Sequence, residues 1–320
     1  MAAPRPSWVE PMLATLTAER FSDPAWFYEP KLDGERCIAI RGGGEVRLLS
    51  RNRKRLDGHY PELVAALAGQ AADDFAVDGE IVAFDAGGDR SSFERLQRRM
   101  QLEHPPPALR AEVPIFYYLF DVVYANGFDL TRLRCRDRKA VLLGLLSFAD
   151  PLRATPHRDT EGEAFWREAC AKGWEGVIAK RADAPYVHRR SRDWLKFKCV
   201  NEQEFVIGGF TDPKGSRVGF GALLVGYYDG DDLVYAGKVG TGFDDELLRS
   251  LRRRLDVLEQ DRPPFTVGRP PAAGTHWVRP ELVAQLGFAE WTGDGRLRHP
   301  RFLGLRDDKD PRSVVRERPR

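Results

Sequence analysis

The segment Glu29-Pro-Lys-Leu-Asp-Gly-Glu-Arg36 joins two stretches whose patterns are typical of β-strands. The aromatic run Trp26-Phe27-Tyr28 precedes it, and residues 36–50, in which two alternating runs flank the glycines at 42–44, follow it. The second pattern predicts a β-hairpin. Lys31 therefore stands in a short connection between a proline and a glycine, beside carboxylates, and is a candidate nucleophile. Taken alone, the segment also fits a charged surface turn.

The remainder of the first 200 residues mixes strand and helix patterns. Strand-like runs recur at 75–84, 115–124, 175–181 and 194–200. Helices are predicted at 61–69, at 92–102 with a capping box of Ser91 and Glu94, at 136–147 and at 161–172. Pro105 to Pro107 is interpreted as a loop. An α+β fold follows from this mixture.

The pattern changes after about residue 200. Short β-rich runs separated by glycines continue to the end of the chain, with one predicted helix near 244–258, and this pattern favours a small barrel. A chain of 320 residues is also longer than one hydrophobic core usually supports. Two domains are therefore predicted, at 1–200 and 201–320.

Composition narrows the class of protein. Apolar residues make up 42% and charged residues 31%, which excludes disordered and fibrous classes. No apolar run is long enough to span a membrane and the first residues lack a signal-peptide core, so we expect a cytoplasmic protein with no membrane partner. The four cysteines, Cys37, Cys135, Cys170 and Cys199, have no metal-binding or redox spacing, and we expect free thiols.

Charged residues alternate with apolar ones in two predicted strands. Asp78 and Glu80 share one face of a mostly apolar strand, where carboxylates need a cation or hydrogen-bond donors. Lys196 and Lys198 share one face of another strand, a pattern that a half-buried edge strand would also produce. Together these pairs fit a site for a metal-bound polyphosphate. Basic runs such as 189–198 fit either a solvated face or a polyanion partner.

The motifs form an ordered set. EPKLDGER, SRNR, DGEIVAF, FYYLFD, EGVIAKR, WLKFK and RDDK resemble the nucleotidyltransferase motifs of ATP-dependent DNA ligases, in the expected order over almost the whole chain. FGALLVGYY, LVYAGKVGTGF and RHPRFLGLRDDKDP most resemble the bacterial end-joining ligases, either a ligase D module or a stand-alone relative.

This resemblance implies a fold and an activity. The fold is an adenylation domain with antiparallel sheets and flanking helices, followed by an OB-fold domain. The activity is ATP-dependent sealing of nicks that carry a 3′-hydroxyl and a 5′-phosphate, through a lysyl-AMP on Lys31 and a DNA-adenylate. ATP and Mg²⁺ or Mn²⁺ are the implied cofactors. The implied partners are nicked duplex DNA, and Ku with an end-joining polymerase, for a monomer in the bacterial cytoplasm.

The resemblance also implies residue roles. Glu29 reads the adenine edge, Arg36 and Arg51 contact the ribose and the terminal 5′-phosphate, and Phe120 stacks on adenine with Ile178 opposite. Lys196 and Lys198 hold the α-phosphate, while Arg306 and Lys309 act on the leaving pyrophosphate.

Glu80 and Glu175 are expected to bind the metal, directly or through water. We interpret them as metal ligands rather than as partners of a charged Lys31, because the nucleophile needs a lowered pKa. In an ideal strand Glu175 and Ile178 would point to opposite faces. Both can therefore act on one site only if Glu175 lies in the turn before the strand.

Two other classes remain open at this point. An RNA ligase or an mRNA capping guanylyltransferase shares the lysine motif and the paired lysines, and capping would require GTP. A nick-binding adapter without catalysis would need none of the reactive residues, and all of them are present.

Overall fold

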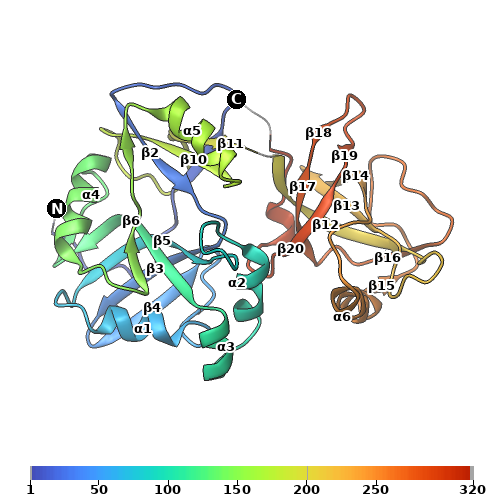
Figure 1. The fold of residues 1–320 in the computed structure, drawn as a ribbon, viewed down its shortest axis with the longest axis horizontal. Helices are drawn as coiled ribbons and strands as arrows, with labels where there is room; N and C mark the ends of the chain where they lie inside the picture. Colours follow the sequence, from blue (N-terminus) through green and yellow to red (C-terminus); the bar gives the residue numbers. More distant parts are fainter. Residues whose placement is uncertain (1, 200, 318–320) are drawn as a thin grey trace. The chain divides into compact units, whose positions relative to one another are not determined.

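The computed structural model describes residues 2–199 and 201–317. They form two compact units that divide after Cys199 (Figure 1). No helix among the described residues is long and apolar enough to cross a membrane.

The first unit contains two sheets. Its five-stranded sheet has the order β1 (Leu13–Leu16), β11 (Arg190–Lys198), β10 (Gly176–Arg181), β2 (Trp26–Lys31) and β9 (Arg158–Asp159). The six-stranded sheet has the order β4 (Glu45–Ser50), β3 (Glu35–Gly42), β5 (Phe75–Ala83), β6 (Ile115–Ala125) and β7 (Phe128–Asp129), with β8 (Leu152–Ala154) parallel to β6. Most neighbouring strands are antiparallel, as the family resemblance implies.

The two sheets face each other across a shared apolar layer. Ile38 and Phe120 from the six-stranded sheet pack there with Trp194 of β11. On the other face of the six-stranded sheet pack α1 (Pro61–Ala68), α2 (Phe93–Met100) and part of α4 (Cys135–Leu145). Residues of α5 (Gly162–Ala171) cover the other face of the five-stranded sheet. Each side chain between the two sheets is therefore covered on both sides by a sheet.

Local predictions hold for most elements, with two corrections. The hairpin closes at Gly42 opposite Glu45, as expected. The N-cap of α2 is Ser92, whose hydroxyl accepts from the Arg95 amide; Ser91 instead accepts from the amide of Asp33. The predicted proline-rich loop includes Pro105 and Pro106 but is one residue too long, because Pro107 begins a short helix, α3 (Pro107–Glu112), where its fixed φ suits the first turn.

The second unit is built on one coiled sheet. Its strands are β12 (Asn201–Thr211), β13 (Leu223–Asp229), β14 (Asp232–Val239), β15 (Glu259–Gln260), β16 (Thr275–Val278), β17 (Val283–Phe288) and β20 (Arg301–Leu305). A small ribbon of β18 (Glu290–Trp291) and β19 (Leu297–Arg298) and a 3₁₀ turn at Pro311–Ser313 complete it. The long strand β12 pairs with β17, β13 and β16 along successive parts of its length. The helix α6 (Asp245–Asp256) buries three leucines in the same core.

The cysteine prediction was wrong for one pair. Cys170 in α5 and Cys199, just after β11, form a disulfide, whereas Cys37 and Cys135 are free and buried. The helix packs on the sheet that contains β11, and this packing brings together two residues 29 positions apart. Their spacing along the chain carries no sign of that contact.

Candidate active site

Three neighbouring strands, β2, β10 and β11, carry predicted site residues on one face. Residues directly opposite each other in antiparallel strands point to the same side of the sheet. One cross-strand row contains Lys31, Gly176 and Lys198, the next contains Glu29, Ile178 and Lys196, and the third contains Phe27, Lys180 and Trp194. The side chain of Trp194 packs in the layer between the sheets, so this face is the inner one.

Lys31 is paired with Glu175. Glu175 lies immediately before β10, in the turn where the sequence required it, and its carboxylate forms an ion pair with the Lys31 ammonium. Burial alone would lower the pKa of Lys31, but the charge and hydrogen bond of Glu175, with smaller effects of Asp33 and Glu80, raise that pKa well above its ordinary value. This corrects the expectation that Glu175 is no partner of a charged Lys31. In this state Lys31 is protonated.

Two lysines hold the carboxylate of Glu29. Lys139 of α4 contacts Oε1, and Lys180 of β10 lies 2.7 Å from Oε2. Lys139 also donates to the carbonyl oxygen of Thr155 at 2.9 Å. Burial by itself would raise the pKa of Glu29, but the two ammonium groups hold it below its usual range. The Glu29 side chain is therefore buried and ionised.

The opposite sheet places Arg36 over Phe120. Arg36 donates two hydrogen bonds to the carboxylate of Asp78, at 2.5 and 2.6 Å, and its guanidinium carbon lies 4.6 Å from the centre of the Phe120 ring. Tyr186 donates a further hydrogen bond to Asp78 at 2.6 Å. Asp78 is thus met by a cation and a donor, as its place on an apolar strand required. Phe120 is itself almost buried.

The other predicted residues of the first unit are Glu80, Arg51, Lys196 and Lys198. Glu80 is directly opposite Arg36 in the ladder between β3 and β5. Arg51 is half-buried in the turn that follows β4, and Lys196 and Lys198 are half-buried on the inner face.

The two glutamates fit a divalent cation that also binds phosphate oxygens. Glu175 contacts Lys31 and raises its pKa, and the charge of Glu80 adds a smaller effect in the same direction. Among residues 2–199 and 201–317, no group of three or more His, Cys, Asp or Glu side chains forms a metal cage. Mg²⁺ is usually held by one or two carboxylates together with substrate phosphates and water, which matches this donor set.

Arg306 and Lys309 belong to the second unit. There Arg306 donates to both oxygens of Asp308, at 2.8 and 2.9 Å, and Lys309 lies 2.7 Å from a carboxylate oxygen of Glu204. The structure thus places these two residues near each other, in a unit different from the one that contains Lys31.

Sequence reasoning missed the contributions of α4. Arg138 makes a doubly hydrogen-bonded ion pair with Asp121, the residue after Phe120, and Lys139 reaches Glu29. Two adjacent basic residues in an amphipathic helix were the only available signal, and such residues usually face solvent. Both are buried here.

The fold and site define a class of protein. A lysine paired with a carboxylate, on a sheet whose inner face carries further lysines, together with a separate β-rich domain, is the arrangement of a covalent nucleotidyltransferase. The family described as "ATP dependent DNA ligase domain" matches residues 11–198, and "ATP dependent DNA ligase C terminal region" matches residues 216–309. The chain belongs to the ATP-dependent DNA ligases, with an adenylation domain followed by an OB-like domain.

Within this family the chain is similar to the ligase part of LigD. It is 41% identical, over 99% of its length, to the multifunctional non-homologous end joining protein LigD of Pseudomonas aeruginosa, and 39% identical, over 96%, to that of Mycobacterium tuberculosis. It spans only 37% and 40% of those proteins. A solved structure, mycobacterial DNA ligase D complexed with ATP and MES, has 35% identity and a TM-score of 0.68, with 97% of this chain and 98% of that chain covered.

Proposed function

We propose that this ligase seals 3′-hydroxyl/5′-phosphate nicks in duplex DNA through a covalent AMP on Lys31. The supporting observation is the inner-face row of Lys31 and Lys198, with Lys196 and Glu29 in the adjacent row and Glu175 against the nucleophile. This arrangement brings together the three chemical groups that adenylylation needs, namely a nucleophilic amine, cations for the phosphate and carboxylates for a metal.

The first step requires an unprotonated Lys31. Its Nζ lone pair forms a bond to the α-phosphorus of ATP while the bond to pyrophosphate breaks, so the ammonium proton must pass to water beforehand. In the protein alone Glu175 holds that proton on Lys31. A divalent cation bound by Glu80 and Glu175 would neutralise these carboxylates and so lower the pKa of Lys31. AMP then passes to the 5′-phosphate, and the 3′-hydroxyl displaces it.

We assign nucleotide recognition to the surrounding residues. The ionised Glu29 accepts from the amino group of adenine, and Phe120 and Ile178 enclose the base. Arg36 and Arg51 contact the ribose and the terminal 5′-phosphate, and Lys196 and Lys198 bind the α-phosphate oxygens. Arg306 and Lys309 of the second unit orient the pyrophosphate, which requires the units to close during the first step.

Intact mass spectrometry after incubation with ATP and Mg²⁺ tests this proposal. The expected result is a gain of one AMP group by the wild type, none by Lys31→Ala, and little with GTP. Lys31→Ala should still seal a nick that already carries AMP. Normal adduct formation by Lys31→Ala would refute the assignment of the nucleophile, and a preference for GTP would favour a capping enzyme.

We further propose a role in bacterial double-strand break repair. The similar proteins carry names that specify non-homologous end joining, and their ligase part covers nearly all of this chain. The partners would be Ku and an end-joining polymerase, and the ligase itself would act as a cytoplasmic monomer. The test is whether the cognate Ku stimulates the joining of DNA ends more than it stimulates the sealing of a simple nick. Equal rates of end joining with and without Ku would contradict this role.

A further inference from the structure

The contact between Lys139 and Glu29 joins two parts of the chain 110 residues apart. Lys139 is 5% exposed, and both Glu29 and Lys180 are 2% exposed. One lysine would be enough to neutralise one buried carboxylate, yet two are present and each contacts a different oxygen. Lys139 is itself fixed by the carbonyl oxygen of Thr155. Both oxygens of Glu29 therefore have a set position.

The state of this carboxylate decides which base it can accept. Adenine carries an amino group, a hydrogen-bond donor, at the position where guanine carries a carbonyl oxygen, an acceptor. An ionised carboxylate only accepts hydrogen bonds, so it binds the amino group and repels the carbonyl; a protonated one could donate to the carbonyl. A fixed, ionised acceptor thus discriminates against GTP, because guanine would leave buried polar groups unpaired.

We propose that Lys139 is a positioning residue that sets the preference for ATP over GTP through Glu29. This inference rests on the proposed role of Glu29 at the adenine edge. Lys180 remains as a second cation, so loss of Lys139 alone leaves Glu29 paired but frees its Oε1 oxygen to change protonation and orientation.

The test compares the rates of lysyl-nucleotide formation from ATP and GTP at subsaturating nucleotide. Lys139→Met is expected to reduce the ATP/GTP ratio about tenfold or more, chiefly by raising the KM for ATP. Lys139→Arg should restore much of the preference. Lys172→Met, which removes a lysine that is 52% exposed, is the matched control and should change nothing.

A double variant separates positioning from general structure. In the Glu29→Gln background the Lys139→Met change should no longer affect the ratio, because the carboxylate on which it acts is gone. An unchanged ratio in Lys139→Met, or an equal fall in both backgrounds, would overturn the proposal. If Lys139→Met does not fold, Lys139→Gln keeps a donor without the charge and answers the same question. If Glu29→Gln still forms the adduct on Lys31 with an unchanged ATP/GTP ratio, the proposed role of Glu29 is wrong. The proposed ligase activity would stand in that case.

A second inference comes from the independent observation of the disulfide. Cys170 and Cys199 close a loop of the chain that contains Glu175 and the inner-face residues of β10 and β11. The amide of Cys199 donates to the carbonyl oxygen of Glu175 at 3.0 Å, and Glu175 is the partner of Lys31. The bond therefore lies two contacts from the nucleophile.

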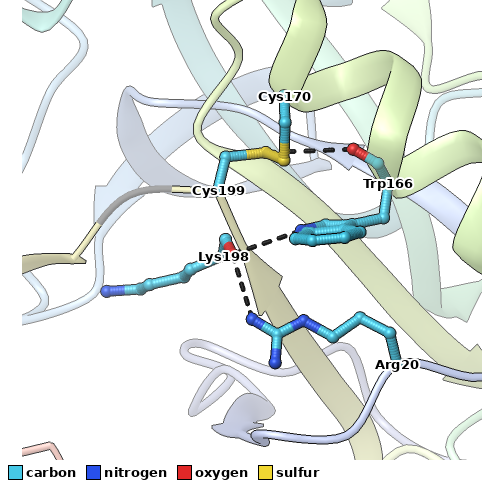
Figure 2. Close-up of a disulfide and its surroundings, with 5 residues drawn as sticks. All are labelled: Arg20, Trp166, Cys170, Lys198 and Cys199. Carbon is cyan, nitrogen blue, oxygen red and sulfur yellow. Dashed lines mark hydrogen bonds between the residues drawn. A yellow bond between two sulfur atoms is a disulfide. The ribbon is translucent and has the colours of Figure 1, made fainter.

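The backbone beside the disulfide is held by other groups as well. The carbonyl oxygen of Lys198 accepts from the guanidinium of Arg20 and from the indole of Trp166, each at 3.2 Å (Figure 2). The sulfur of Cys199 lies 4.0 Å from the carbonyl oxygen of Trp166, which a thiol could use as an acceptor and a disulfide cannot. Reduction would thus release the tether while the end of β11 keeps its hydrogen bonds.

We infer that Cys170 and Cys199 form a reversible thiol site that responds to small or protein dithiols. Disulfides that form in reducing compartments are usually transient or redox-sensing. In the reaction a dithiol gives two electrons and two protons to the Cys170–Cys199 bond, which becomes two thiols, while the reagent becomes a disulfide. The oxidised protein has α5 tied to the end of β11, and the reduced protein does not.

Alkylation in denaturant, followed by intact mass, tests the site. Air-oxidised protein should take up two alkyl groups, on Cys37 and Cys135, and protein treated with dithiothreitol should take up four. Dithiothreitol should also lower the Tm of the wild type by several degrees and leave Cys170→Ser/Cys199→Ser unaffected, because only the former loses a cross-link. Four alkyl groups before reduction, or an identical Tm in both states, would overturn this inference.

Discussion

Removal of the Arg138 guanidinium should strongly destabilise the first unit. Arg138 and Asp121 have side-chain exposures of 0% and 1%, and their two hydrogen bonds measure 2.7 and 2.9 Å. Arg138→Met would leave the Asp121 carboxylate buried without its cation, which typically costs about 3–5 kcal/mol. For a unit of this size each kcal/mol lowers the Tm by roughly 2–4 °C. A fall of about 6–20 °C is therefore expected.

The same helix supplies a matched control. Arg134 also makes two hydrogen bonds to an aspartate, Asp137, at 2.7 and 3.1 Å, but these side chains are 61% and 37% exposed. Arg134→Met should leave the Tm nearly unchanged, because water solvates both groups when the pair is broken. Thermal unfolding of both variants, monitored by near-UV circular dichroism, compares the two pairs directly.

A compensating change identifies the cause. Asp121→Leu introduced together with Arg138→Met removes both charges, and it should recover a large part of the lost stability, since the cost comes from the unpaired carboxylate. Two results would contradict this reasoning: an equal Tm shift in Arg138→Met and Arg134→Met, or a further loss of stability when Asp121→Leu is added. Either would mean that burial does not determine how much the ion pair stabilises the protein.

Three further outcomes are expected. In Glu175→Gln the pKa of Lys31 should fall, so that an amine-specific acylating reagent labels Lys31 at lower pH than in the wild type; an unchanged labelling profile would contradict the ion pair. Hydrogen bonds that the His276 ring donates to the carboxylates of Glu259 and Asp212 raise the pKa of His276, so its stabilising effect is complete below the unfolded pKa of about 6.5 and disappears as pH rises through the folded value. Urea unfolding should therefore show that His276→Gln costs most stability in acid and little above the folded pKa; a cost independent of pH would exclude this linkage. Arg306→Ala should lose adduct formation from ATP yet seal a pre-adenylylated nick, and failure in both single-turnover assays, with an unchanged Tm, would reject a pyrophosphate role.

Local sequence patterns account for most of the fold. The hairpin at 36–50 was predictable because the turn glycines and the alternation of side chains are encoded within a few residues. The strand pattern at 175–181 included Glu175, whereas β10 begins at Gly176; only the joint role with Ile178 that the resemblance implied required Glu175 to precede the strand.

The partners of buried charges could not be predicted in the same way. Lys139 meets Glu29, and Cys170 meets Cys199, only after α4 and α5 have packed against the sheets. A helix shows which of its faces is apolar, but it does not show which distant carboxylate or thiol will lie beside a given position. Contacts of this kind depend on tertiary packing, so a single sequence leaves them open.

The charged groups of the first unit are paired with one another in the protein alone. Glu175 holds the proton on Lys31, Asp78 engages Arg36, and Glu29 is paired with two lysines. A polyphosphate that binds such a site can take the place of the carboxylates as the partner of these cations. Its binding therefore need not leave new charges buried without partners. Under the proposed function, Glu175 would help to hold the cation that accompanies ATP, and that cation would neutralise its carboxylate. Lys31 would then lose its proton only when a nucleotide is present to receive its attack.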